Sequence, residues 1–125
     1  MRNLDLSKLD ADALLKLHVE WSMQQDVALQ RANISKVNEL GGRINQINNE
    51  LKSRPGDQRG TLASLLSHPN AQVRFNAAQS LIRILPIEAR QTMQVIADSG
   101  VFPLAGHAGM YLSMHDGEAA RILRG

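Results

Sequence analysis

The sequence of 125 residues contains no cysteine. This absence excludes disulfide bonds, thiolate catalysis, iron–sulfur clusters and cysteine zinc sites. A chain of this length can bury a sizeable core as one domain without disulfides or a structural metal. We therefore expect a single domain in a reducing compartment, the cytoplasm.

Aromatic residues, net charge and long apolar runs are also scarce. The chain has one tryptophan, one tyrosine and two phenylalanines, too few for a base-stacking platform, and its formal net charge is only +2. No run approaches the ~20 apolar residues of a membrane span. Acidic residues interrupt the first apolar stretch, so no secretion signal is expected. The composition favours neither nucleic acid nor a membrane as a partner.

Side chains that could carry catalysis or hold a metal are sparse. His107 and His115 could share one side of a helix, but they lack i, i+4 spacing and a complete ligand set. No serine lies in a strand–turn–helix context that exposes a nucleophile. We interpret His18 as a packing residue at the edge of the face that carries Trp21, and His68 as a turn residue. We predict no catalytic residue, no cofactor and no metal site, so the chain is not expected to be an enzyme.

Apolar residues recur at helical spacing along most of the chain. No stretch alternates with the period of two that marks a strand, so the pattern predicts an all-α fold of about six helices. Ser7 predicts a helix over 8–30, and Asn33 predicts a second one over 34–53. We then expect a short helix around 62–66 and helices over 70–85, 86–99 and 103–115, the last ended by Asp116 and Gly117.

These elements divide into three parts within the single domain. An N-terminal helical hairpin takes residues 1–53, a stack of helices takes 54–117, and a tail takes 118–125. Gly41 and Gly42 lie inside the second helix, where each costs ~1 kcal/mol against alanine. We expect a kink or a close helix crossing there.

The first helix carries an apolar row that is separate from its core-facing stripe. The stripe consists of Ala13, Leu14, Leu17, Trp21 and Ala28. The second row lies on another side and consists of Leu15, Val19, Met23 and Val27. A helix that is apolar on two sides needs two neighbours. We favour cover by the segment 118–123 or by another helix, and the alternative is a contact with another protein.

A basic turn follows the second helix. Lys52, Arg54 and Arg59 lie close together around a Pro-Gly pair, and such cations could hold a carboxylate, a phosphate or an acidic partner. In the alternative that we favour, Asp57 caps the next helix and the arginines are solvated or tie the hairpin to the stack. If an anion binds to this protein, we expect it to contact Lys52, Arg54 and Arg59.

Arg74 lies at the centre of an apolar arc on the helix over 70–85. Because it is in the first turn, its methylenes can pack over a neighbouring helix while the guanidinium reaches an acceptor. Burial without an acceptor would cost several kcal/mol. We expect Arg74 to be a structural tie that bonds to Asp57, to Asp98 or to carbonyls at the end of an adjacent helix.

The stretch over 61–84 resembles a HEAT-like repeat. It contains "TLASLL", a turn with "HPN", and "VRFNAAQSLIRI", which match that family's short helix, polar turn and Val-Arg followed by two alanines and a leucine. Such repeats ordinarily have an aspartate in the turn, where this chain has Asn70. The longer pattern of "ELKSRPGDQR", "LLSHPNAQVR", "ADSG" and "AGMYLSMHDG" is similar to a small bacterial family of single-domain proteins of unknown function. The HEAT-like resemblance implies stacked helices that bind proteins, and the similarity to the family of unknown function implies a fold without a catalytic residue.

We therefore predict a cytoplasmic protein-binding module without catalytic activity. The partner would be an unidentified protein or a second copy of the chain, and an immunity-type inhibitor and an adaptor are two specific forms. The alternative is a nucleic-acid or phosphate ligand at the basic turn over 52–59. The predicted partner contact is Leu15, Val19, Met23 and Val27.

Overall fold

The computed structural model describes residues 4–124, and this part of the chain is helical without strands, which confirms the predicted all-α class. Five α-helices and two 3-10 segments follow one another in it. They are η1 (Leu6–Lys8), α1 (Ala11–Gln30), α2 (Ile34–Ser53), η2 (Gln58–Ser67), α3 (Ala71–Leu81), α4 (Pro86–Ala97) and α5 (Leu104–Arg124).

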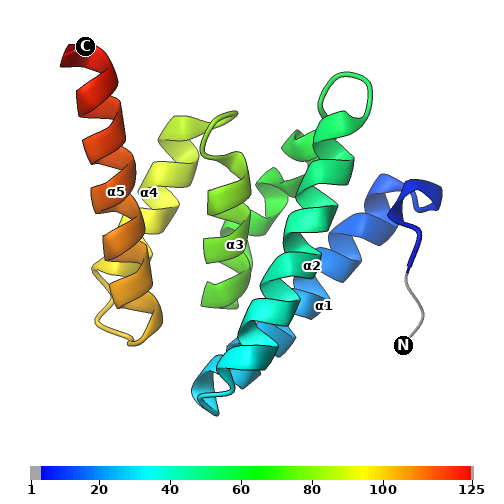
Figure 1. Cartoon of the computed structure of the whole chain (residues 1–125), viewed down its shortest axis with the longest axis horizontal. Coiled ribbons are helices and arrows are strands. Elements are labelled where there is room, and N and C mark those ends of the chain that lie inside the picture. Colours follow the sequence, from blue (N-terminus) through cyan, green and yellow to red (C-terminus); the bar gives the residue numbers. More distant parts are fainter. Residues whose placement is uncertain (1–3, 125) are drawn as a thin grey trace.

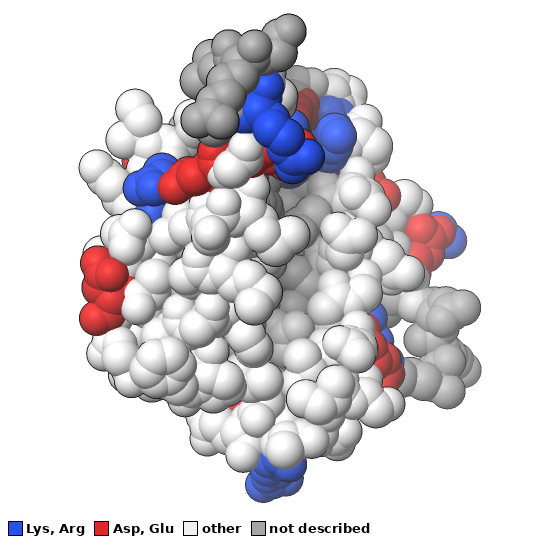
Figure 2. Space-filling model, turned by 60° about the vertical axis from the view of Figure 1, so that its left-hand side comes forward, with Lys and Arg blue, Asp and Glu red and all other residues white. Residues whose placement is uncertain are grey.

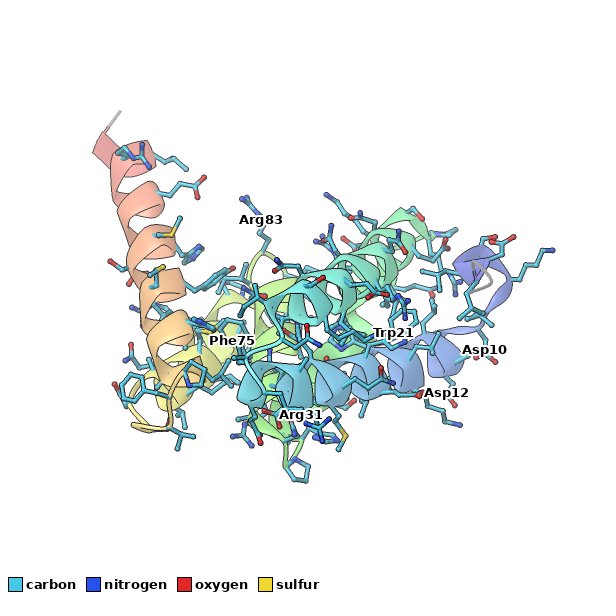
Figure 3. All side chains as sticks on the ribbon, turned by 60° about the horizontal axis from the view of Figure 1, so that its bottom comes forward. Asp10, Asp12, Trp21, Arg31, Phe75 and Arg83 are labelled. Atoms are coloured by element: carbon cyan, nitrogen blue, oxygen red, sulfur yellow. The ribbon has the colours of Figure 1, made fainter. Side chains whose placement is uncertain are left out.

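The helices stand in one row (Figure 1). The α1–α2 hairpin forms one end of the row, α3 and α4 follow, and α5 forms the other end. Each α-helix packs mainly on its neighbours, and α3 also contacts both α1 and η2. The two largest buried aromatic side chains, Trp21 and Phe75, lie between the helices (Figure 3). The apolar core is continuous from the hairpin to α5.

Side-chain caps explain where two of the helices begin. The Asn33 carboxamide oxygen accepts from the Lys36 amide at 3.2 Å, and that of Asn70 accepts from the Val73 amide at 3.1 Å. Each bond satisfies an amide that has no partner inside its own helix. The predicted starts of α2 and α3 are confirmed, as is the end of α2 at Ser53.

The predicted start of the first helix is wrong. Asp10 is its cap, with the carboxylate accepting from the Ala13 amide at 2.8 Å. Ser7 instead lies in η1 and donates to Asp5 through its hydroxyl at 2.6 Å. Asp5 thus caps η1 and Asp10 caps α1, which begins at Ala11.

Several other boundaries also differ from the prediction, including the end of α4, which is at Ala97 and not at 99. The short helix is a 3-10 segment over Gln58–Ser67. Helix α3 ends at Leu81, and a turn over 82–85 leads to Pro86. Leu85, the residue before this proline, has non-helical backbone angles. Helix α5 does not stop at Asp116 and Gly117 but continues to Arg124, so 118–124 is helical and not a tail.

A tertiary ion pair accompanies the continuation of α5. Arg90 on α4 donates two bonds to the Asp116 carboxylate, at 3.3 and 2.6 Å. The sequence pair Asp116-Gly117 is typical of a helix end. Here Asp116 is fixed on α4 as a member of the helix, and Gly117 takes an interior helical position.

Of the paired glycines, one lies against a side chain of α1. Helix α2 runs through both positions, and a Cβ atom added to Gly41 would lie 3.3 Å from the Gln25 side-chain nitrogen on α1. The same atom on Gly42 would meet nothing within 4 Å. Gly41 therefore serves the approach of α1 to α2, and Gly42 does not.

Arg74 bonds to backbone and not to a carboxylate. Its guanidinium donates to the His68 carbonyl at 2.8 Å and to the Pro69 carbonyl at 3.1 Å. Carbonyls at the end of an adjacent helix were one of the expected acceptor classes. The other two candidates have different partners, since Asp57 bonds to Arg59 and Asp98 to Gln94. Arg74 thus closes the turn between η2 and α3.

Candidate functional site

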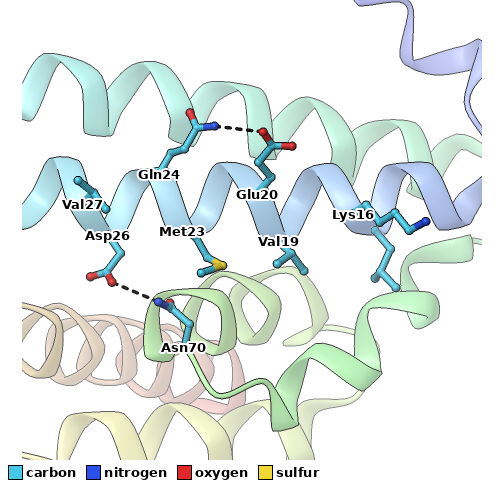
Figure 4. A pocket seen from close by; sticks show the side chains of 9 residues that line it. Lys16, Val19, Glu20, Met23, Gln24, Asp26, Val27 and Asn70 are labelled. Atoms are coloured by element: carbon cyan, nitrogen blue, oxygen red, sulfur yellow. Dashed lines mark hydrogen bonds between the residues drawn. The ribbon is translucent and has the colours of Figure 1, made fainter.

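An open groove of about 640 Å³ runs along one side of α1 (Figure 4). Its lining comes from α1 and from Asn70 at the start of α3. All four members of the predicted contact row lie in it: Leu15, Val19, Met23 and Val27. The structure therefore brings these side chains together on one recessed surface.

The C-terminal segment does not cover the row, so this part of the expectation is wrong. The other part, cover by another helix, holds for Leu15 and Val19, which pack against the core. Helix α5 packs mainly on α4 and stands at the opposite end of the row of helices from the hairpin (Figure 1). Leu15 and Val19 are half-buried, whereas Met23 is 44% and Val27 47% exposed. The half of the groove near the end of α1 is thus the more open half.

Asn70 joins the two walls of the groove. Its carboxamide oxygen caps α3 at Val73, and its nitrogen donates to the Asp26 carboxylate on α1 at 3.2 Å (Figure 4). One side chain therefore sets the start of α3 and holds α1 against it. On the outer rim, Gln24 donates to Glu20 at 3.4 Å.

The recess continues toward the turn between α1 and α2. A neighbouring hollow of about 300 Å³ shares Gln24 and Val27 with the groove. Arg31 and Lys36 line its far side, and Arg31 lies at the end of α1 (Figure 3). The groove on α1 is thus continued by a hollow that two basic side chains line.

A buried polar cluster behind the groove holds α1 and α3 together. Asn76 donates to Ser22 at 2.9 Å and to Gln25 at 2.8 Å, and Gln72 donates to Gln25 at 3.2 Å. All four side chains are buried, and Gln25 also donates to the Val37 carbonyl at 3.1 Å. The sequence alone does not predict this cluster. Its only signal is polar residues at helical spacing beside the core stripes.

His18 is fully buried in the core next to this cluster along α1. Within the described part of the chain, neither imidazole nitrogen has a hydrogen-bond partner. Burial lowers the pKa of His18 from its ordinary 6.5 to about 4. The predicted packing role is therefore confirmed, but His18 lies inside the core and not at the edge of the Trp21 face.

The arginines of the basic turn bond inside the protein. Arg54 donates to the Leu9 carbonyl at 2.6 Å and to Glu50 at 2.9 Å, which ties the end of α2 to the start of the chain. Arg59 donates to the Asp57 carboxylate at 2.9 and 2.6 Å, and this bonding lowers the pKa of Asp57. Both arginine side chains are 16% exposed, while Lys52 is exposed. These contacts favour the structural interpretation over an anion site.

Among residues 4–124, no group of three histidine, aspartate or glutamate side chains could hold a metal ion. Over the same range, no helix is long and apolar enough to cross a membrane.

A second apolar surface lies at the α4–α5 end and was not expected from the sequence. Its exposed members include Val95, Phe102, Met110 and Met114, each 65–72% exposed. Figure 2 shows this end of the molecule as a broad uncharged face with charged side chains along its edges. Unlike the row on α1, these side chains stand on the outside of the terminal helices.

Comparisons with known proteins give a family but no activity. The crystal structure of the protein RPA1889 from Rhodopseudomonas palustris CGA009 is 41% identical, with 91% of this chain and 94% of that chain covered and a TM-score of 0.86. No curated protein matches the sequence. The predicted similarity to a family of unknown function is confirmed, and the HEAT-like resemblance stays a prediction. The domain of unknown function DUF2019 matches residues 12–116, which include the whole groove, so the chain belongs to that family.

Proposed function

We propose that the chain is a protein-binding module without catalytic activity, and that the groove on α1 receives an amphipathic helix of the partner. The observation that carries this proposal is the exposure of Met23 and Val27 within a mainly apolar recess. A contiguous apolar recess on a small protein is a typical contact for a protein or ligand.

The length and spacing of the row suit a helix. The row extends from Leu15 to Val27, roughly 18 Å at 1.5 Å per residue, or about three helical turns. A partner helix would place apolar residues at i, i+4 and i+7 against it, as in known helix-in-groove contacts. Full burial of a valine or methionine side chain contributes about 1.5–3 kcal/mol. Because Met23 and Val27 are about half exposed, a partner that covers them could add roughly half of this free energy at each side chain.

The charges around the recess restrict the partner. Lys16 and Glu20 lie along the groove, and Arg31 and Lys36 lie at its end. A partner helix with an acidic residue at the end that meets Arg31 and Lys36 would be favoured. Such rim charges set orientation and specificity more than affinity.

The proposal covers three arrangements with different readouts. An adaptor and an immunity-type inhibitor both bind a different protein, whereas self-association places a second copy on the groove. The molar mass of the purified chain separates self-association from the other two. A dimer that becomes a monomer when Met23 and Val27 are changed would identify a second copy as the occupant.

The test is a paired capture experiment with the double variant Met23→Glu/Val27→Glu. Both side chains are about half exposed, so we expect the free energy of unfolding to change by less than about 1 kcal/mol. Carboxylates facing an apolar partner surface should lower partner capture from host extract by at least about tenfold. Capture is quantified by mass spectrometry against the unmodified chain.

The matched control is Met110→Glu/Met114→Glu on α5, where the side chains are 65% and 69% exposed. This variant adds the same charge at the other end of the molecule and should keep the partner. Equal capture by the unmodified chain and both variants, with unchanged mass, would refute the groove as the binding site.

A further inference from the structure

A second recess, of about 450 Å³, lies between the turn after α3 and the C-terminal half of α5. Arg83 comes from the turn, while Tyr111, His115, Glu118 and Arg121 come from α5. We propose that this recess binds a small organic phosphate that carries a planar ring. The site is separate from the groove on α1 and does not depend on it.

Two side chains of this recess, Glu118 and Arg121, lie in the part of α5 that the sequence did not predict to be helical. Tyr111, His115 and Glu118 recur at steps of four and three, so they share one side of the helix, and Arg121 follows one turn later. If α5 had ended at Gly117, Glu118 and Arg121 would not be held beside the other side chains. Gly117 lines the recess, and a Cβ atom there would meet nothing within 4 Å, so the position leaves open space.

The two guanidinium groups of the recess have no internal role. Within the described part of the chain, neither Arg83 nor Arg121 makes a hydrogen bond or an ion pair, whereas Arg54, Arg59 and Arg90 all bond to carboxylates. Arg83 projects from its turn clear of the helices (Figure 3). Unpaired guanidinium groups from two different elements are suited to bind the oxygens of one phosphate.

Two aromatic rings line the recess together with these cations. The rings of Tyr111 and His115 are parallel within 6°, with centroids 6.2 Å apart, and both side chains are half-buried. Burial raises the pKa of the Tyr111 hydroxyl, Arg83 lowers it and Glu118 raises it again. Arg83 and Glu118 therefore both lie within electrostatic range of this hydroxyl. Together with Met114, the rings offer a flat apolar surface beside the charges.

The balance of charge favours an anion. Two arginines and one acidic residue, Glu118, line the recess, and no ion pair within the described residues joins them. Figure 2 shows charged side chains gathered at the top of this face, near the end of α5. Glu118 would weaken the binding of a phosphate group by repulsion. Its removal should therefore strengthen binding, which a nonspecific effect of mutation would not do.

The experiment is an NMR titration of the full chain with phenyl phosphate, inorganic phosphate and phenol, with arginine Nε signals observed. We expect phenyl phosphate to bind more tightly than either fragment. Arg83→Gln and Arg121→Gln should each weaken phenyl phosphate binding about tenfold, since charge-assisted hydrogen bonds are lost. Glu118→Gln should strengthen it.

Lys8→Gln is the control for the loss of a surface cation, because Lys8 is exposed in η1 and lines neither this recess nor the groove on α1. It should bind phenyl phosphate like the unmodified chain. The proposal would be overturned by equal affinity for phenyl phosphate, inorganic phosphate and phenol, by equal effects of Lys8→Gln and Arg83→Gln, or by no saturation at about 10 mM. The Met23→Glu/Val27→Glu variant should bind normally, so this proposal and the groove proposal fail independently.

Discussion

His18 places a titratable side chain in the centre of the core without a hydrogen-bond partner among the described residues. Such a group is tolerated only in its neutral form, since a buried unpaired charge is expensive. Between pH 6.5 and about 4 the unfolded chain binds a proton that the folded chain excludes. A fall in pH from 6.5 therefore destabilises the fold through His18.

The free energy of unfolding should fall as the pH drops from 6.5 toward 4. The difference between these pKa values corresponds to roughly 3 kcal/mol, fully present above pH 6.5 and lost at pH 4. In His18→Leu this loss should disappear, and stability at pH 7 should be equal or higher, because an unsatisfied polar group is replaced by an apolar one. Urea unfolding at a series of pH values measures both effects.

His107→Gln is the control for the loss of a histidine, since His107 is exposed. It should keep the pH dependence of the unmodified chain. A His18→Leu variant with the same slope between pH 6.5 and 4 would show that His18 is not the group responsible.

At the scale of single elements, the glycines of α2 and α5 differ in what surrounds them. Added Cβ atoms at Gly117 and Gly42 would meet nothing within 4 Å, but at Gly41 one would lie 3.3 Å from the Gln25 side chain. Alanine restricts the unfolded chain and favours the helix by about 0.5–1 kcal/mol where it fits.

We expect Gly117→Ala and Gly42→Ala each to raise the free energy of unfolding by about 0.5–1 kcal/mol. Gly41→Ala should gain less or lose stability, because Gln25 must shift within the buried polar cluster. Thermal unfolding followed by circular dichroism measures the three variants. A loss of stability in Gly117→Ala would contradict a continuous α5 through this position.

Element prediction succeeded where local chemistry decides the outcome. Asn33 and Asn70 cap their helices through their own side chains, so their positions follow from sequence spacing. The end of α5 did not follow, because the helix continues through an Asp-Gly pair, and the bond of Asp116 to Arg90 on α4 is not visible in the sequence. Local rules for Asp-Gly pairs cannot include such a contact.

The candidate site was predictable only in part. The apolar row on α1 was found from its period of four, since a second apolar side is visible in the sequence. The sequence does not show where α5 lies, so it could not show whether α5 covers this row. The cluster of Ser22, Gln25, Gln72 and Asn76 was missed because polar residues are normally assigned to the surface, and their burial depends on partners on another helix.

At the scale of the whole molecule, two apolar surfaces lie at different places along one row of helices. The groove on α1 is recessed, and the α4–α5 face stands at the outer end. The central claim is that the groove is open in the isolated chain and filled in the cell. Methionines in the groove, on α5 and in the core allow all three regions to be compared in one molecule.

Methionine oxidation by dilute peroxide, quantified by mass spectrometry in the purified chain and in its complex from the host, tests this claim directly. Met23 should oxidise at a rate similar to Met110 and Met114 in the purified chain, and fully buried Met93 should react far more slowly. In the complex, Met23 should be protected several-fold while Met110 and Met114 stay reactive. Protection of Met23 in the purified monomer, or its undiminished oxidation in the complex, would contradict the proposal.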